Sequence, residues 1–95
     1  MTARPKFNYF RSRKYLMNVA ALPCQNCYIE GQTQASHSNW SGHGKAKSLK
    51  ASDEFVAALC QKCHYEVDQG KTLTKQEKSQ MWHNAFVKTK VLLGT

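Results

Sequence analysis

The spacing of core-type residues is most regular near the C-terminal end of the chain, where it predicts a long helix. Side chains that would share one helical face recur there every three or four positions, at Met81, Trp82, Ala85, Phe86, Thr89, Leu92 and Leu93. Thr74 and Glu77, which lie just before this run, are spaced as in a capping box. We therefore expect the helix to begin after Thr74 and to bury Trp82 and Phe86.

Shorter patterns upstream predict two further helices and two strands. Positions 15, 16, 19 and 20 share one face of a helix that opens at Ser12 and ends before Pro23. Residues 32–36 form a polar strand that leads into His37, and the apolar run 55–59 forms a buried strand. A short helix over residues 64–69 is closed by Gly70. Together these elements indicate a small α+β domain.

The long segment between the two strands, residues 39–52, is rich in Ser, Gly and Lys and predicts a loop. Loops of more than about 12 residues in a compact domain are usually functional or disordered. With 95 residues the chain can form one domain, which we assign to residues 12–95, after a basic N-terminal arm of residues 1–11. Because so small a domain has a limited core, an additional stabilising element is expected.

The net charge of +8 indicates an anionic partner, because summed positive charge attracts polyanions. Nucleic acid fits best, acidic membrane surface fits less well, and a purely solubilising role for the charge stays open. No apolar run reaches the roughly 20 residues of a membrane span, and residues 1–6 do not resemble a signal peptide. We therefore expect a cytoplasmic protein without a membrane partner, in which cysteines bind metal and do not form disulfides.

Four cysteines in two CxxC pairs, about 32 residues apart, predict a structural zinc site formed by Cys24, Cys27, Cys60 and Cys63. Two residues between cysteines let a tight turn direct both thiolates at one ion. Since four thiolates fill a tetrahedral site, no position would remain for chemistry. Cys60 to His64 also matches the CxxCH pattern of haem attachment, but that reading requires export and leaves Cys24 and Cys27 unexplained.

Three further side chains are candidates for catalysis. His64 and Asp68 are four positions apart in a predicted helix, so they share a face and could hold one divalent cation or simply hydrogen bond to each other. His37 lies at the end of a predicted strand, and histidine can accept a proton from water near neutral pH. The positions of these three residues alone do not establish a catalytic role.

The order of the motifs resembles the zinc-containing HNH endonuclease superfamily, and in particular its small phage and prophage members, the YbcO-like and NinG/Rap-like recombination nucleases. The resemblance covers residues 21–87. It is carried by Leu22–Cys27 (LPCQNC), Ala35–Asn39 (ASHSN), Lys50–Asp53 (KASD), Ala58–His64 (ALCQKCH) and Glu66–Gly70 (EVDQG).

This resemblance implies a ββα-metal fold, in which a hairpin and a helix hold a catalytic cation and the cysteines hold a zinc ion behind it. By position, His37 would be the general base, and His64 and Asp68 would bind Mg²⁺ or Mn²⁺. Ser36 stands where many members have another metal ligand, and no Asn occupies the middle position near Phe55, where Asp53 is the nearest polar residue. The recombination relatives favour branched DNA as the substrate.

The basic residues of the arm, the first helix and the long loop are the candidates for contacts to DNA phosphates. They are Arg11, Arg13, Lys14, Lys45, Lys47 and Lys50. Trp40 has two open readings, stacking on DNA or packing on the zinc site. We expect a metal-dependent DNA endonuclease; the alternative is a zinc-dependent nucleic-acid-binding module that does not cut, and cleavage in the presence of Mg²⁺ or Mn²⁺ distinguishes the two.

Overall fold

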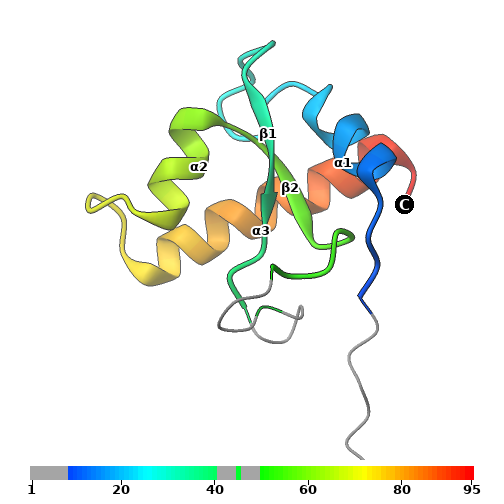
Figure 1. The fold of residues 1–95 in the computed structure, drawn as a ribbon. Helices are drawn as coiled ribbons and strands as arrows, with labels where there is room; N and C mark the ends of the chain where they lie inside the picture. Colours follow the sequence, from blue (N-terminus) through cyan, green and yellow to red (C-terminus); the bar gives the residue numbers. More distant parts are fainter. Residues whose placement is uncertain (1–8, 41–44, 46–49) are drawn as a thin grey trace, which may run out of the picture.

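A computed structural model describes residues 9–40, 45 and 50–95 and shows a small α+β fold (Figure 1). Along the chain the elements are α1 (Arg13–Ala20), β1 (Thr33–His37), β2 (Val56–Cys60), α2 (Gln61–Asp68) and α3 (Lys75–Leu93). The predicted number, type and order of elements in this part of the chain are confirmed. The β1–β2 connection is described only in part, and Lys47 lies outside the described residues.

The two strands form an antiparallel hairpin in which Thr33 pairs with Cys60 and His37 with Val56. Every residue of β2 is buried, because the strand has packing partners on both of its faces. Since successive side chains of a strand point to opposite faces, Ala57 and Leu59 enter one apolar cluster, whereas Val56 and Ala58 enter the other. This double burial explains why the sequence of β2 is continuously apolar and not alternating.

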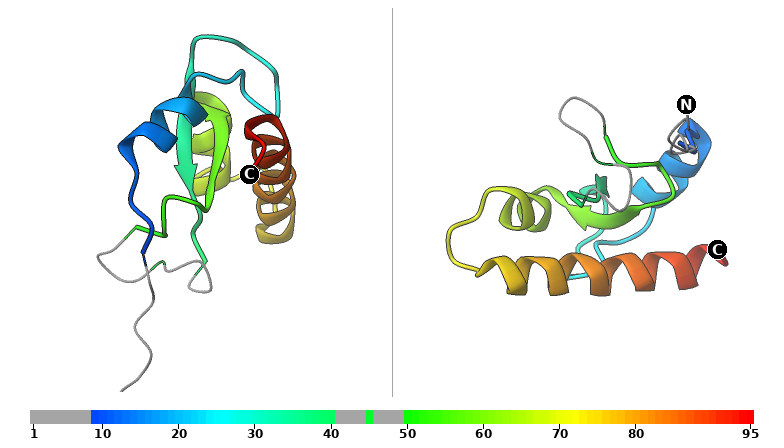
Figure 2. Two further views of the ribbon diagram at one scale, coloured as in Figure 1. Left: turned by 90° about the vertical axis from the view of Figure 1, so that its right-hand side faces the viewer. Right: turned by 90° about the horizontal axis from the view of Figure 1, so that it is seen from below.

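The helix α3 runs along one face of the hairpin, while α1 and α2 lie on either side of it (Figures 1 and 2). Two buried polar groups of α3 hold the hairpin in place. The Trp82 indole N–H donates to the Ser36 carbonyl at 3.1 Å, and the Thr89 hydroxyl accepts the Ala58 N–H at 3.0 Å. Trp82 is 1% exposed, as predicted, and Phe86 is only half-buried.

The helix starts follow the predicted capping residues, with one difference. Ser12 caps α1, and Thr74 and Glu77 form the complete capping box at α3. The helix α2 begins at Gln61, three residues earlier than predicted, because β2 ends at Cys60 and the second CxxC segment is itself the first turn of the helix. Among the described residues, no helix combines the length and apolar character needed to cross a membrane.

The segment before α1 is tied to the segment before β2. The Phe10 N–H donates to the Ser52 hydroxyl at 2.8 Å, and the Asp53 N–H donates to the Phe10 carbonyl at 2.8 Å. Arg11 donates to the carbonyls of Ala51 and Lys50 at 2.6 and 2.9 Å. Residues 10 and 11, which the sequence analysis assigned to a basic arm, are therefore part of the folded domain, and residues 1–8 lie outside the described part.

Candidate functional site

The four cysteines lie together where the segment after α1 meets the junction of β2 and α2. Their Sγ atoms are all within 4.8 Å of one another, and all four are free thiols. The Cys27 and Cys60 Sγ atoms are 3.6 Å apart. Sulfur ligands about 2.3 Å from a tetrahedral ion would be separated by about 3.8 Å, so this set could hold one metal ion.

The backbone around the first CxxC pair supplies hydrogen bonds to sulfur. The N–H groups of Asn26 and Cys27 point at Cys24 Sγ at 3.4 and 3.5 Å, and the Asn26 amide donates to Cys63 Sγ at 3.3 Å. The turn closes at Tyr28, which has the positive φ of 65°. These donors favour thiolates, which are the form that binds metal.

The cysteines differ in acidity because those donors are unequally shared. Burial raises the pKa of Cys24, but the hydrogen bonds from Cys27, Cys60 and Asn26 outweigh it and lower the pKa to about 6. Burial, together with the neighbouring thiols, raises the pKa of Cys63 to about 12, and the Asn26 amide offsets only part of that effect. A divalent cation bound to the cluster would favour deprotonation of every thiol it contacts.

A second candidate site is a cleft of about 310 Å³ between the hairpin and α2. His37, His64 and Asp68 line it together, although the two histidines are 27 positions (64 − 37) apart in the chain. Lys45 and Lys50, from the described part of the β1–β2 connection, line the same cleft. The fold therefore brings the three predicted catalytic residues and two of the predicted phosphate contacts to one place.

His64 and Asp68 are held in position by two residues that the sequence analysis did not identify. The His64 Nε2 and Asp68 Oδ2 atoms are 3.0 Å apart, as expected for a pair on one helical face. Gln34 Oε1 lies 2.8 Å from His64 Nδ1, and the Asn39 amide donates to Asp68 Oδ1 at 2.8 Å. Both partners lie in or just after β1, so their proximity to α2 depends on tertiary packing and leaves no local sequence signal.

His37 belongs to a partly buried polar cluster centred on Asp53. The His37 Nε2 atom is 2.9 Å from Asp53 Oδ1, which also accepts from Arg11 at 3.1 Å, and Asp53 Oδ2 accepts the Ser12 N–H at 2.8 Å. Burial raises the pKa of Asp53, but the hydrogen bonds from His37, Ser12 and Arg11 outweigh it and hold the pKa below its usual range. An ionised carboxylate accepts only, so Nε2 carries the proton and Nδ1 is the basic nitrogen of a neutral His37.

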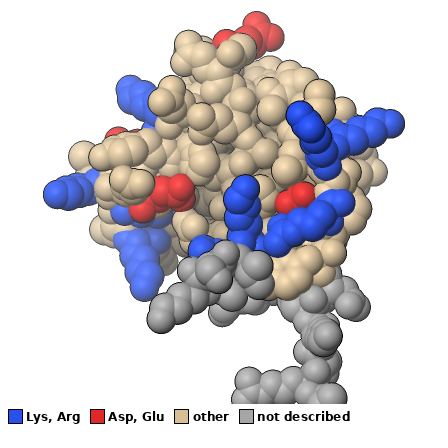
Figure 3. Space-filling model, in the orientation of Figure 1, with Lys and Arg blue, Asp and Glu red and all other residues tan. Residues whose placement is uncertain are grey.

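The other predicted contacts to DNA that the structure describes lie in α1 or just before it. Arg13 and Lys14 are exposed at the start of α1, whereas Arg11 is engaged with Asp53 and the backbone of residues 50 and 51. Figure 3 shows Lys and Arg side chains over much of one face of the molecule, several of them gathered below its middle. This face therefore carries exposed Lys and Arg side chains that a polyanion could contact.

Ser36, which stands where a further metal ligand was considered, does not reach the cleft. Its side chain is completely buried, and its hydroxyl has no hydrogen-bond partner among the described residues. Its carbonyl accepts from Trp82 of α3, on the far side of the hairpin. Ser36 therefore contributes to packing and not to a cation site.

One known protein family matches almost the whole chain. The family model described as "Protein of unknown function (DUF968)" matches residues 1–90. The chain belongs to the DUF968 family. The match includes every residue of the cysteine cluster and of the cleft, so both sites lie within the DUF968 domain. No curated protein and no solved structure gives a significant match to the chain.

Proposed function

We propose that this DUF968 protein is a metal-dependent endonuclease of the HNH type, which hydrolyses phosphodiester bonds in DNA. The observation that carries the proposal is the cleft in which His37, His64 and Asp68 meet beside Lys45 and Lys50. It combines a base, a pair of cation ligands and phosphate-neutralising charge within one concave site, and these are the components that phosphodiester hydrolysis needs.

The arrangement of the elements supports the same assignment. A ββα-metal site consists of a hairpin followed by a helix, and here β1, β2 and α2 follow one another in that order. His37 ends the first strand, and His64 and Asp68 lie on the helix. The four-cysteine cluster lies at the other end of the hairpin, since Cys60, at the end of β2, pairs with the first residue of β1. Four thiolates at this spacing are typical of structural zinc sites.

His64 and Asp68 fit a small divalent cation. Two neighbouring ligands of an octahedral ion, each about 2.1 Å from it, would be about 3.0 Å apart. The His64 Nε2 and Asp68 Oδ2 atoms have this separation. Mg²⁺ commonly retains several waters and takes one or two protein ligands, so the pair is sufficient without Ser36. A cation bound there would supply positive charge beside the scissile phosphate and the departing oxygen.

Each of these residues would then have a separate role in the hydrolysis. His37 takes a proton from the attacking water at Nδ1, because Asp53 keeps the other proton on Nε2. Arg11 and Ser12 hold Asp53 in place and keep it ionised, which makes Asp53 a positioning residue. Lys45 and Lys50 bind the phosphates on either side of the bond that breaks.

The test is a cleavage assay on zinc-loaded protein with supercoiled, linear, single-stranded and branched DNA, with added Mg²⁺ or Mn²⁺ or with neither. We expect cleavage that requires the added cation and that is lost in His37→Ala and His64→Ala. Asn84→Ala is the control, because Asn84 is an exposed polar residue of α3 that does not line the cleft. DNA binding should persist in all three variants.

Two results would count against the proposal. Cleavage that survives in His37→Ala would show that another group activates the water or that a contaminating nuclease is present. Binding without cleavage under every condition would instead favour the zinc-dependent nucleic-acid-binding module. In that case the basic surface around the cleft would serve recognition only.

A further inference from the structure

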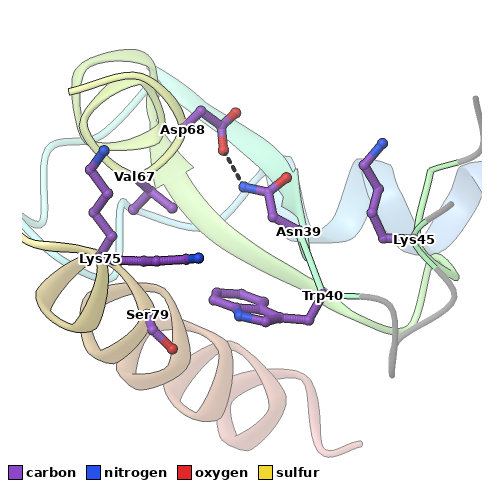
Figure 4. Close-up of a pocket in the computed structure, with 8 residues that line it drawn as sticks. Asn39, Trp40, Lys45, Val67, Asp68, Lys75 and Ser79 are labelled. Carbon is purple, nitrogen blue, oxygen red and sulfur yellow. Dashed lines mark hydrogen bonds between the residues drawn. The ribbon is translucent and has the colours of Figure 1, made fainter. Parts of the chain in front are cut away.

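The cleft is continuous with a second, larger hollow that the proposed chemistry does not use. This hollow has a volume of about 560 Å³, and it shares Asn39, Lys45 and Asp68 with the cleft. Figure 4 shows Asn39 and Trp40 reaching in from the end of β1, opposite Lys75 and Ser79 on α3. A volume of this size is within the range of sites that bind small organic groups.

Trp40 forms a fixed aromatic surface on one side of this hollow. Its ring packs on Trp82, with the centroids 5.2 Å apart, and Trp82 stacks on Phe86 at 5.0 Å with an interplanar angle of 11°. Because Trp82 is buried and bonded to the Ser36 carbonyl, the ring that supports Trp40 is immobilised. Trp40 itself is half-buried and lines the hollow, so one part of it packs inward and another faces the cavity.

The opposite side of the hollow is positively charged. Lys75 and Lys78 line it from the first turn of α3, where the helix dipole adds partial positive charge. Glu77 is in the same turn, but its carboxylate accepts the Thr74 N–H as part of the capping box. Asp68, the one acid among the lining residues, is proposed above as a cation ligand.

A third hollow of about 280 Å³ extends the same surface along α3. It shares Trp40 and Ser79 with the second hollow and ends at Gln80 and His83. The three hollows therefore form one groove that leads from His37 and His64, past Trp40, to the side of α3. This groove is defined by its lining residues on the end of β1, on α2 and on α3.

We propose that this groove binds unpaired nucleotides of the DNA strand next to the scissile phosphate, with a base stacked on Trp40 and phosphates near Lys75 and Lys78. A base within a duplex is covered on both faces by its neighbours, so it can reach the indole only when it is unpaired. This inference rests on the proposed endonuclease function for the identity of the neighbouring site. It assigns a substrate class, DNA that has an unpaired segment beside the cut.

The experiment measures binding by fluorescence anisotropy with zinc-loaded protein and no other divalent cation. The two probes are a short fluorescein-labelled duplex and the same duplex with an unpaired thymine branch. The variants are Trp40→Leu, Trp40→Phe and the double variant Lys75→Gln/Lys78→Gln. The matched control is Lys62→Gln/Lys71→Gln, which removes the same charge from two exposed lysines outside the groove.

We expect the unchanged protein to prefer the branched probe. Trp40→Leu should weaken binding of that probe by about 5- to 150-fold, the range for loss of one base–aromatic stack, and leave duplex binding unchanged. Trp40→Phe should restore most of the preference. The double lysine variant should reduce the slope of log affinity against log salt by about 1.4 for the branched probe, as expected for two single-strand phosphate contacts, and the control should not.

The inference is overturned if Trp40→Leu, with its zinc content and circular dichroism unchanged, binds both probes as the unchanged protein does. It is also overturned if Trp40→Leu weakens both probes equally, or if Trp40→Phe fails to restore the preference. These outcomes are independent of cleavage. Absence of cutting with an intact preference for the branched probe would contradict the proposed function alone, whereas cutting without any preference would contradict the groove assignment alone.

Discussion

Replacing Asp53 by asparagine should destabilise the domain far more than the same loss of charge elsewhere on the chain. The Asp53 side chain is 7% exposed and accepts from Arg11 and His37 at Oδ1 and from the Ser12 N–H at Oδ2. An amide keeps one acceptor oxygen. In its best orientation, that oxygen replaces Oδ1 and the NH₂ group then faces the Ser12 N–H, so one hydrogen bond is lost and two donors oppose each other.

The size of the effect follows from those contacts. A hydrogen bond to a charged group contributes about 1.5–3 kcal/mol, and such bonds are roughly twice as strong as neutral ones. The contribution of the Arg11 ion pair to this energy is left out, because the Arg11 side chain is 43% exposed and water screens the pair. The loss at Ser12 and the weakening at His37 together give about 2–4 kcal/mol for Asp53→Asn. In a domain of this size that lowers the melting temperature by about 10 to 25 °C.

The effect should also depend on pH, with a sign fixed by the lowered pKa of Asp53. A carboxyl that is more acidic in the folded state binds fewer protons there, so its contribution to stability is complete above its unfolded pKa of about 4. It is lost as the pH falls through the folded value. The difference in stability between the unchanged protein and Asp53→Asn should therefore be constant near neutral pH and should narrow below about pH 4.

The assay is thermal unfolding of zinc-loaded protein followed by circular dichroism, with Glu54→Gln as the control. Glu54 is the neighbouring acid, and its replacement removes the same charge outside the cluster of Asp53. Zinc loss in acid affects all three proteins, so only differences between them are interpreted. Equal melting temperatures for the two variants, or a difference that widens in acid, would refute this account of Asp53.

Two further predictions concern the metal and the last helix. Cys60→Ala should unfold the domain, because zinc bound by four thiolates contributes about 10–16 kcal/mol, more than the total stability of most domains this small. Zinc analysis and circular dichroism test this, and a folded variant without zinc would contradict it. Thr74→Ala removes the capping box of α3 and should cost about 1 kcal/mol with the metal content unchanged, measured by denaturant unfolding; no change in stability would mean that the helix end contributes nothing.

The elements could be predicted because their signals are local. The capping pairs at Ser12 and Thr74, the stop at Pro23 and the helical spacing of α3 all lie within a few residues of what they determine. The convergence of the four cysteines was predictable for a related reason, since one ion imposes a fixed geometry on its ligands. The start of α2 was predicted too late because the CxxC segment was interpreted as a turn before the helix.

The partners of the candidate catalytic residues could not be predicted in this way. Gln34 and Asn39 meet His64 and Asp68 only because β1 packs beside α2, and Arg11 meets Asp53 only because the segment before α1 lies against the segment before β2. Each of these contacts joins residues about 30 to 40 positions apart, and polar residues of these types are common on any surface. The sequence therefore indicated candidate catalytic side chains but not the residues that position them.

The position of Asp53 shows how the hairpin register selects a partner for His37. His37 pairs with Val56, so the residues just before β2 are brought next to the end of β1. A search for an asparagine near Phe55 finds none in the sequence, but the turn at 53 and 54 returns Asp53 to within 2.9 Å of the imidazole. A carboxylate there fixes one tautomer of His37, whereas an amide can present either its oxygen or its NH₂ group.

The cysteine cluster and the cleft are coupled through the first turn of α2. Cys63 and His64 are adjacent in the chain, and Cys60 is both the last residue of β2 and the cap of the helix that carries His64 and Asp68. Metal bound by the cysteines would fix where this helix begins, and therefore where His64 and Asp68 face β1. Removing that metal should disturb the cleft even though none of the four cysteines lines it.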